Sequence, residues 1–411
     1  MPGISTDIDA DEVGFDPVRL RRIDALLQSY VDRGFLPGCQ FVLGRGDHVA
    51  HTVLTGSRDL ESGAPFTDDT IVRLYSMTKP ITSVAAMMLY EEGAFELKDP
   101  VAKFIPSFAD VRVYRSGSSI APMLEPATEP VRIWHLLTHT AGLTYGFHHN
   151  NAVDAAYRAA GFEWGTPKGA DLAACCDLWA QLPLLFQPGS EWNYSVCTDV
   201  LGRVVEVASG MSLDAFFAER ILGPLGMVDT AFSVPADDVD RLAALYSPAP
   251  GTRLAKRNDA MGAAALAPPT CLSGGGGLVG TAHDYHRFTR MLLGGGELDG
   301  VRLLGPRTVD YMTTNHLPGG QDLTAFGRPL FSETQFDGVG FGLGFSVVED
   351  VAAYRVLSSP GTYAWGGAAS TAFWVDPYEG ITAVLLTQLL PSSTHPIRTQ
   401  LMQLVLQAVV D

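Results

Sequence analysis

Hydrophobic positions near the N-terminus follow first a helical and then a strand-like period. Asp16 and Pro17 form a helix-start signal, because aspartate caps free backbone N–H groups and proline fits the first helical turn. Apolar residues then recur every three or four positions, at Leu20, Ile23, Leu26, Leu27 and Tyr30. Two short β-like runs, 39–43 and 48–54, flank the turn residues 44–47. We therefore expect a helix that ends near Gly34, followed by a β-hairpin.

A similar pattern occurs at the C-terminus. Strand-like runs at 368–375 and 381–388 flank the turn sequence Asp-Pro-Tyr-Glu-Gly at 376–380. A helical stripe follows, formed by Ile397, Leu401, Leu404, Val405 and Ala408. Strands and a helix thus occur at both ends of the chain. The simplest arrangement pairs these strands in one antiparallel sheet flanked by the terminal helices.

Residues 95–265 have a different pattern. Helical stripes, such as Leu201, Val204, Val205 and Ala208, are separated by long loops rich in glycine and proline. The sequence predicts a mostly helical domain over 95–265, inserted into a sheet domain made of residues 1–94 and 266–411. We expect the active site at the interface of the two. The expected fold class is α/β, of the α+β type.

Charge and composition exclude several classes of function. The chain has 411 residues, with 28 Lys and Arg against 45 Asp and Glu, for a net charge of −17. Because such a surface repels phosphate backbones and anionic lipids, we expect no nucleic-acid or membrane partner. The N-terminal segment lacks the apolar core of a signal peptide, and the five cysteines are a poor disulfide framework. These features favour a cytoplasmic protein.

The first candidate for chemistry is the sequence Ser-Met-Thr-Lys at 76–79. Apolar residues at helical spacing follow it, so Ser76 is expected at or near the start of a helix, with Lys79 on nearly the same face. A serine hydroxyl is a weak nucleophile and needs a base within hydrogen-bond reach, which a lysine can provide in suitable surroundings. The motif alone is weak evidence, since a capping serine beside an exposed lysine has the same spacing. Pro80 predicts that the first turn is irregular.

Two further elements carry candidate residues. Tyr194 precedes the helical stripe that begins at Leu201, where its phenol could carry a proton or simply pack. Trp365, Gly366, Gly367 and Ala368 lead into a C-terminal strand. Adjacent glycines indicate either the close approach of a ligand to the backbone or a bend, and a strand edge can supply one N–H of an oxyanion hole.

The three elements together resemble the serine β-lactamase, penicillin-binding and esterase superfamily, in which S-x-x-K, a tyrosine motif and a strand triad converge. The order and wide separation match, as do the Trp-His-Leu-Leu-Thr-His-Thr-Ala-Gly-Leu sequence at 134–143 and the glycine-rich stretch 274–280. Class C β-lactamases carry Y-x-N and a K-T-G-like triad, whereas this chain has Tyr-Ser-Val at 194–196 and Trp-Gly-Gly at 365–367. The resemblance is therefore closest to the family VIII carboxylesterases.

This resemblance implies a role for each residue. Ser76 is the expected nucleophile, with Lys79 and Tyr194 as the pair that activates it. The expected oxyanion hole consists of the backbone N–H groups of Ser76 and Ala368. Substrate contacts are expected from Trp365, Gly366 and Gly367. The implied reaction is hydrolysis of a small-molecule carboxylic ester of short to medium acyl chain, with no cofactor.

Several alternatives stay open. The same acyl-enzyme could serve an acyltransferase, a β-lactamase or a D-amino-acid peptidase, and a non-catalytic binding protein could share the fold. The histidine spacings offer no full metal-ligand set, so we expect no metal. The glycines 274–277 lack the lysine of a phosphate loop and indicate close packing. Cys197 is expected to pack, while Tyr145, Phe147 and His148 are candidates for the pocket wall.

Overall fold

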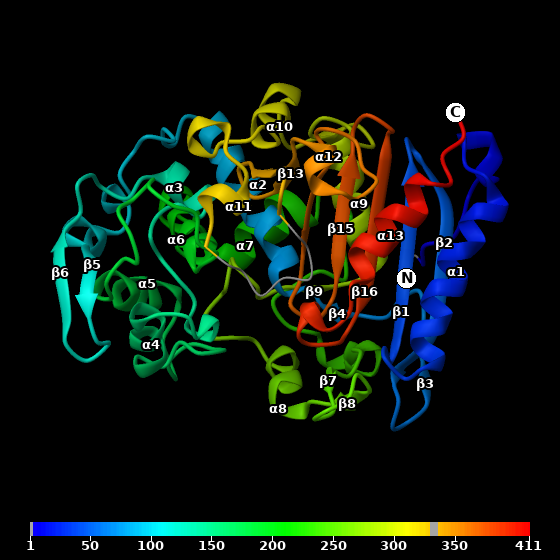
Figure 1. Ribbon diagram of the computed structural model, residues 1–411, viewed down its shortest axis with the longest axis horizontal. Helices are drawn as coiled ribbons and strands as arrows, with labels where there is room; N and C mark the ends of the chain where they lie inside the picture. The colour runs from blue at the N-terminus through cyan, green and yellow to red at the C-terminus, as the bar shows by residue number, and fades with distance from the viewer. Residues whose placement is uncertain (1–2, 329–335) are drawn as a thin grey trace.

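An antiparallel sheet of eight strands runs through the molecule in the order β12-β13-β14-β15-β16-β1-β2-β3 (Figure 1). This computed structural model describes residues 3–328 and 336–411. The eight strands are β1 (Gly38–Arg45), β2 (His48–Asp59), β3 (Ala64–Pro65), β12 (Val339–Phe341), β13 (Ser346–Val348), β14 (Tyr363–Gly366), β15 (Ala372–Asp376) and β16 (Ile381–Thr387). Strand β16 pairs antiparallel with β1, so the predicted joining of the two chain ends in one sheet is confirmed.

Helices cover both faces of this sheet. Helices α1 (Pro17–Asp32) and α13 (Ile397–Leu406) lie side by side on one face, while α2 (Thr78–Glu91) and α9 (Ala282–Leu293) lie on the other (Figure 1). The Asp16 carboxylate caps α1 by accepting the N–H groups of Val18 and Arg19. Successive residues of β1 point to opposite faces: Phe41 packs with the terminal helices and Val42 with the other core.

The chain between α2 and β9 carries most of the remaining helices, and α3 to α7 lie away from the sheet (Figure 1). The elements of this part are β5 (Arg112–Gly117), β6 (Pro122–Pro126), α3 (Ile133–Leu137), α4 (Ala152–Ala159), α5 (Leu172–Gln181), α6 (Cys197–Ser209), α7 (Leu213–Phe217), β7 (Tyr246–Pro248), β8 (Ala255–Arg257) and α8 (Asp259–Gly262). The β7–β8 hairpin is tied to the sheet, because the Tyr246 amide donates to the Gln388 carbonyl at 2.9 Å. The predicted boundaries of the helical domain, at residues 95 and 265, stay a prediction.

Short elements complete the described chain. They are β4 (Val72–Arg73), β9 (Val279–Gly280), β10 (Glu297–Leu298), β11 (Val301–Arg302), α10 (Pro306–Met312), α11 (Leu323–Phe326) and α12 (Val351–Tyr354). Across 3–328 and 336–411, no helix combines the length and the apolar character needed to cross a membrane.

The predicted strand 368–375 begins later than expected. Residues 367–371 form a tight connection between β14 and β15, in which the Gly367 amide donates to the Thr371 carbonyl at 2.9 Å. Ser370 has a φ of 66°, in the left-handed region that a strand does not use. The Trp-Gly-Gly sequence therefore lies at the end of β14 and in the turn after it, and β15 starts at Ala372.

Candidate active site

Ser76 lies directly before helix α2, in a short 3₁₀ turn over Tyr75–Met77. The expectation of an irregular first turn is confirmed, since Tyr75 has a φ of 47° and α2 begins only at Thr78. A positive φ is strained for a tyrosine and persists where the surrounding structure fixes it. The Lys79 Nζ atom lies 3.3 Å from the Ser76 Oγ atom. The side chain of Lys79 is only 2% exposed, so the reading of an exposed lysine is wrong.

The Lys79 ammonium group is held from several sides. It donates to the Gly275 carbonyl at 2.6 Å and to the Tyr145 hydroxyl at 3.0 Å, besides its contact with Ser76. The ammonium also lies 4.5 Å from the centre of the Tyr194 ring. Because a lysine has three donors and no freedom to swing here, its amine stays beside the serine hydroxyl.

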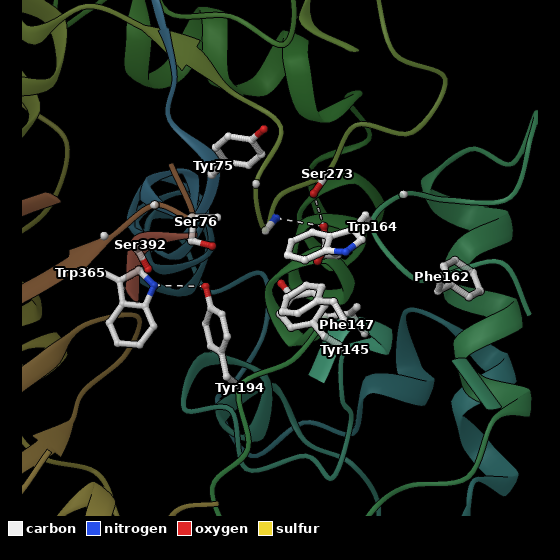
Figure 2. Close-up of a pocket in the computed structure, with 18 of the residues that line it drawn as sticks. Tyr75, Ser76, Tyr145, Phe147, Phe162, Trp164, Tyr194, Ser273, Trp365 and Ser392 are labelled. Carbon is white, nitrogen blue, oxygen red and sulfur yellow. Dashed lines mark hydrogen bonds between the residues drawn. The ribbon is translucent and has the colours of Figure 1, made fainter. Parts of the chain in front are cut away.

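Tyr194 is buried in the loop before α6, and its hydroxyl points toward Ser76 (Figure 2). The Trp365 indole N–H donates to the Tyr194 hydroxyl at 3.3 Å (Figure 2). Behind it, the His139 ring lies 5.0 Å from the Tyr194 ring, and burial lowers the pKa of His139 well below its usual value. The Trp365 indole and the Lys79 amine both lie close to the Tyr194 side chain. The structure thus brings Ser76, Lys79, Tyr194 and Trp365 together.

The Trp-Gly-Gly turn forms another part of the same site. Gly366, Gly367 and Ala368 line a cavity of about 660 Å³ together with Ser76 and Trp365. A Cβ atom on Gly367 would lie 2.3 Å from the carbonyl oxygen of Leu74. Glycine is therefore needed because the chain's own backbone, two residues before Ser76, approaches this turn closely. This approach sets Ala368 near the nucleophile, while the oxyanion role of the two amides stays a prediction.

Asp199 is a site residue that the sequence patterns did not predict. Its buried carboxylate accepts hydrogen bonds from the Ser273 hydroxyl and from the Gly275 amide. Burial raises the pKa of Asp199, and the positive charge of Lys79 opposes this rise. A Cβ atom on Gly275 would lie 2.3 Å from the carboxylate, so the glycine-rich stretch is close packing, as expected. The signal in the sequence was an acidic residue on the apolar, buried face of the helix that became α6.

Tyr145 lies in the loop between α3 and α4 and contacts the Lys79 amine through its hydroxyl. Burial raises the pKa of Tyr145 well above its usual value, with smaller contributions from the charges of Asp199 and Tyr194. Tyr145 and Phe147 line the cavity as expected, whereas His148 lies outside its lining and packs edge-on against Tyr145. The sequence placed Tyr145 in the pocket wall but gave no sign of its contact with Lys79.

The other candidate groups are the histidines and Cys197. No cluster of three or more His, Cys, Asp or Glu could hold a metal ion within the described parts of the chain, and the expectation that no metal or cofactor is needed stays a prediction. Cys197 is fully buried, and burial raises the pKa of its thiol to about 12. A thiol in that state is a poor nucleophile, which agrees with a packing role.

Comparison with known proteins identifies the family. A family model described as Beta-lactamase matches residues 23–407. Protein Rv1367c of Mycobacterium tuberculosis is 38% identical over 375 residues, 89% of each chain. Esterase EstB of Burkholderia gladioli is 31% identical over 385 residues, also 89% of each chain. The solved structure of EstCE1, described as a hydrolase with promiscuous acyltransferase activity, has a TM-score of 0.80 and 28% identity, covering 95% of this chain and 99% of that one. This chain belongs to the beta-lactamase family and has the β-lactamase/transpeptidase-like fold.

Proposed function

We propose that the protein hydrolyses small-molecule carboxylic esters through an acyl-enzyme on Ser76, as a family VIII-like carboxylesterase. The observation that carries this proposal is the 3.3 Å contact between Ser76 Oγ and a buried Lys79 amine, at the wall of a cavity of about 660 Å³. The esterase and hydrolase names of EstB and EstCE1 support the same reaction class. Short to medium acyl chains are the expected substrates.

Lys79 and Tyr194 together remove the proton from Ser76 as its oxygen attacks the ester carbonyl carbon. Tyr194 is the member of the pair suited to hold negative charge, because Trp365 donates to its oxygen and the Lys79 ammonium lies over its ring. The amides of Ser76 and Ala368 bind the oxyanion, each amide contributing roughly 3 kcal/mol by analogy with other hydrolases. The alcohol leaves with a proton from Tyr194. Water then cleaves the acyl-enzyme by the reverse transfer.

The two tyrosines that flank Lys79 are expected to differ sharply in importance. Because burial keeps Tyr145 protonated, Tyr145→Phe should remove only a hydrogen bond to the Lys79 amine and lower kcat about tenfold. Tyr194→Phe should lower kcat by at least about a hundredfold, the size of a general acid–base contribution. The measurement is hydrolysis of p-nitrophenyl butyrate by both variants. Equal losses would make Tyr145 the proton carrier and contradict the assignment.

We expect esters to be preferred to β-lactams. Penicillins and cephalosporins carry a carboxylate that a strand-borne lysine can meet, but Trp365 offers only an indole that already donates to Tyr194. Arg398, a cation in the cavity wall, donates to the carbonyls of Gly367 and Thr371. Leaving the β-lactam carboxylate without a cationic partner should cost about 1–3 kcal/mol of binding free energy, which lowers kcat/KM for β-lactams roughly tenfold to hundredfold. We would compare kcat/KM for p-nitrophenyl butyrate and nitrocefin. A preference for nitrocefin would restore the β-lactamase alternative.

Acyl transfer is the second candidate function. EstCE1 combines hydrolysis with acyltransferase activity, and an alcohol in the cavity could replace water in the second step. Product analysis in the presence of a competing alcohol distinguishes the two reactions, because only transfer yields a new ester.

The five cysteines are all buried and free. A cytoplasmic location and the absence of nucleic-acid and membrane partners stay predictions.

A further inference from the structure

The glycine-rich segment over residues 273–278 supplies an acceptor that holds the Lys79 amine. The Gly275 carbonyl accepts a hydrogen bond from Lys79 at 2.6 Å. The neighbouring position is bound to the same helix, α2, because the Thr82 hydroxyl donates to the Gly274 carbonyl at 2.7 Å. The place of the amine therefore depends on how this segment presents the Gly275 carbonyl.

Asp199, in the first turn of α6, holds the same segment from a second helix. Its carboxylate accepts the Gly275 N–H at 3.0 Å and also accepts the Ser273 hydroxyl. Hydrogen bonds to an ionised acceptor are stronger than those between neutral groups. Gly275 is thus held on both sides, since Asp199 binds its N–H and Lys79 donates to its carbonyl.

The charge of Asp199 also reaches Lys79. The Asp199 side chain is buried, with 4% exposure, and a buried carboxylate destabilises a fold unless donors or a cation compensate it. The positive charge of Lys79 opposes the rise that burial causes in the pKa of Asp199. This attraction is mutual, so the Asp199 charge also stabilises the ammonium group where it lies.

We infer that Asp199 is a positioning residue that acts on catalysis through Lys79. Its hydrogen bond aims the Gly275 carbonyl at the amine, and its charge balances the buried ammonium group. The inference rests on the proposed function, because Asp199 affects the rate in this way only if Lys79 activates Ser76. An acidic residue in a first turn also stabilises its helix through the helix dipole. That structural role would be the same with or without the Lys79 amine.

The test is a double-mutant cycle of Asp199→Asn with Lys79→Met in the full chain, measured by kcat for p-nitrophenyl butyrate and by thermal melt. Asparagine keeps the size of the side chain and an oxygen acceptor for the Gly275 amide, but it removes the charge. In the wild-type background we expect Asp199→Asn to lower kcat about tenfold, the scale of one charge-assisted hydrogen bond. In the Lys79→Met background it should change kcat less than about twofold, because the group on which it acts is gone.

The melting temperatures should move in opposite directions in the two backgrounds. In the wild type, Asp199→Asn removes the partner of a buried ammonium group and should lower the melting temperature by about 2 °C or more. In Lys79→Met, the same change removes a buried carboxylate that has lost its positive neighbour, and it should raise the melting temperature by about 2 °C or more.

Asp284→Asn is the matched control. Asp284 is likewise a buried residue in the first turn of a helix, α9, and its carboxylate accepts one backbone amide and one hydroxyl, those of Asp229 and Thr230. It lies outside the cavity lining. Asp284→Asn should keep kcat within about threefold. It should also shift the melting temperature equally with and without the Lys79 amine.

Three results would overturn the inference. Equal losses of kcat in both backgrounds would show that Asp199 acts independently of Lys79, and a melting temperature that falls in both would show that Asp199 only supports α6. An unchanged kcat in the wild-type background would remove the positioning role, and an accompanying rise in KM would make Asp199 a substrate contact. Failure of the proposed function has a different signature, because Lys79→Met would then keep the wild-type rate while the melting temperatures still moved in opposite directions.

Discussion

Ser76→Ala is expected to lower kcat for p-nitrophenyl butyrate by about four orders of magnitude or more, because the covalent step cannot occur without the serine oxygen. The protein should remain folded. The Lys79 amine loses only its 3.3 Å contact with Ser76 and keeps the Gly275 carbonyl and the Tyr145 hydroxyl as acceptors. The melting temperature is therefore expected to shift by no more than a few degrees.

Purified Ser76→Ala and wild type would be compared by initial rate and by thermal melt. Ser83→Ala is a matched control, since Ser83 is also buried in the α2 region but lies outside the cavity lining. It should keep wild-type kcat within about threefold, a change of less than 1 kcal/mol. Near-wild-type turnover by Ser76→Ala with an intact melt would refute the nucleophile.

Replacing Lys79 and Tyr194 is expected to show that they act as one unit. Lys79→Met keeps the length of the side chain and removes the amine, and Tyr194→Phe removes the hydroxyl. Each should lower kcat at least about a hundredfold. Because both residues take part in one proton transfer, the double variant should be little worse than the poorer single variant. The measurement is kcat for all four proteins on p-nitrophenyl butyrate.

The structural cost of these changes can be separated from the catalytic one. Lys79→Met leaves the buried Asp199 carboxylate without its positive neighbour, and Tyr194→Phe leaves the Trp365 N–H without its acceptor. These losses should lower the melting temperature of each single variant, and because the Lys79 amine contacts the Tyr194 ring, the loss in the double variant should differ from the sum of the two. Multiplicative losses of kcat would show that Lys79 and Tyr194 act independently, which the shared relay does not allow.

Much of the sheet could be predicted because its signals are local. The helical spacing of apolar residues over 20–30 predicted α1, and the strand-like runs within 39–54 predicted the first hairpin. The turn sequence at 376–380 predicted the second hairpin. The error at 368–371 has a local cause as well. Residues 368–371 contain no glycine or proline that would separate them from the strand-forming residues at 372–375, and only the left-handed φ of Ser370 shows the turn.

The site could be predicted where a motif ties two residues within one helical turn, as in Ser76 and Lys79. The contacts of Asp199 and Tyr145 depend on long-range packing. Asp199 meets Gly275 from 76 positions away, and Tyr145 meets Lys79 from 66 positions away. The spacing of apolar residues within one helix or strand carries no information about contacts between residues so far apart in the sequence. Likewise, the glycines at 366–367 could have indicated a ligand or the chain itself. Gly367 packs closely against the Leu74 carbonyl, and both glycines also line the cavity, so their contact with substrate stays a prediction.

The central claim is that catalysis passes through an ester bond to Ser76, and the most direct measurement is the intact mass of the enzyme after rapid acid quenching of its reaction with p-nitrophenyl butyrate. We expect a mass increase equal to one butyryl group per chain, located by peptide mapping at Ser76 and absent from Ser76→Ala. Turnover with no adduct at any quench time, or an adduct on another residue that persists in Ser76→Ala, would contradict it.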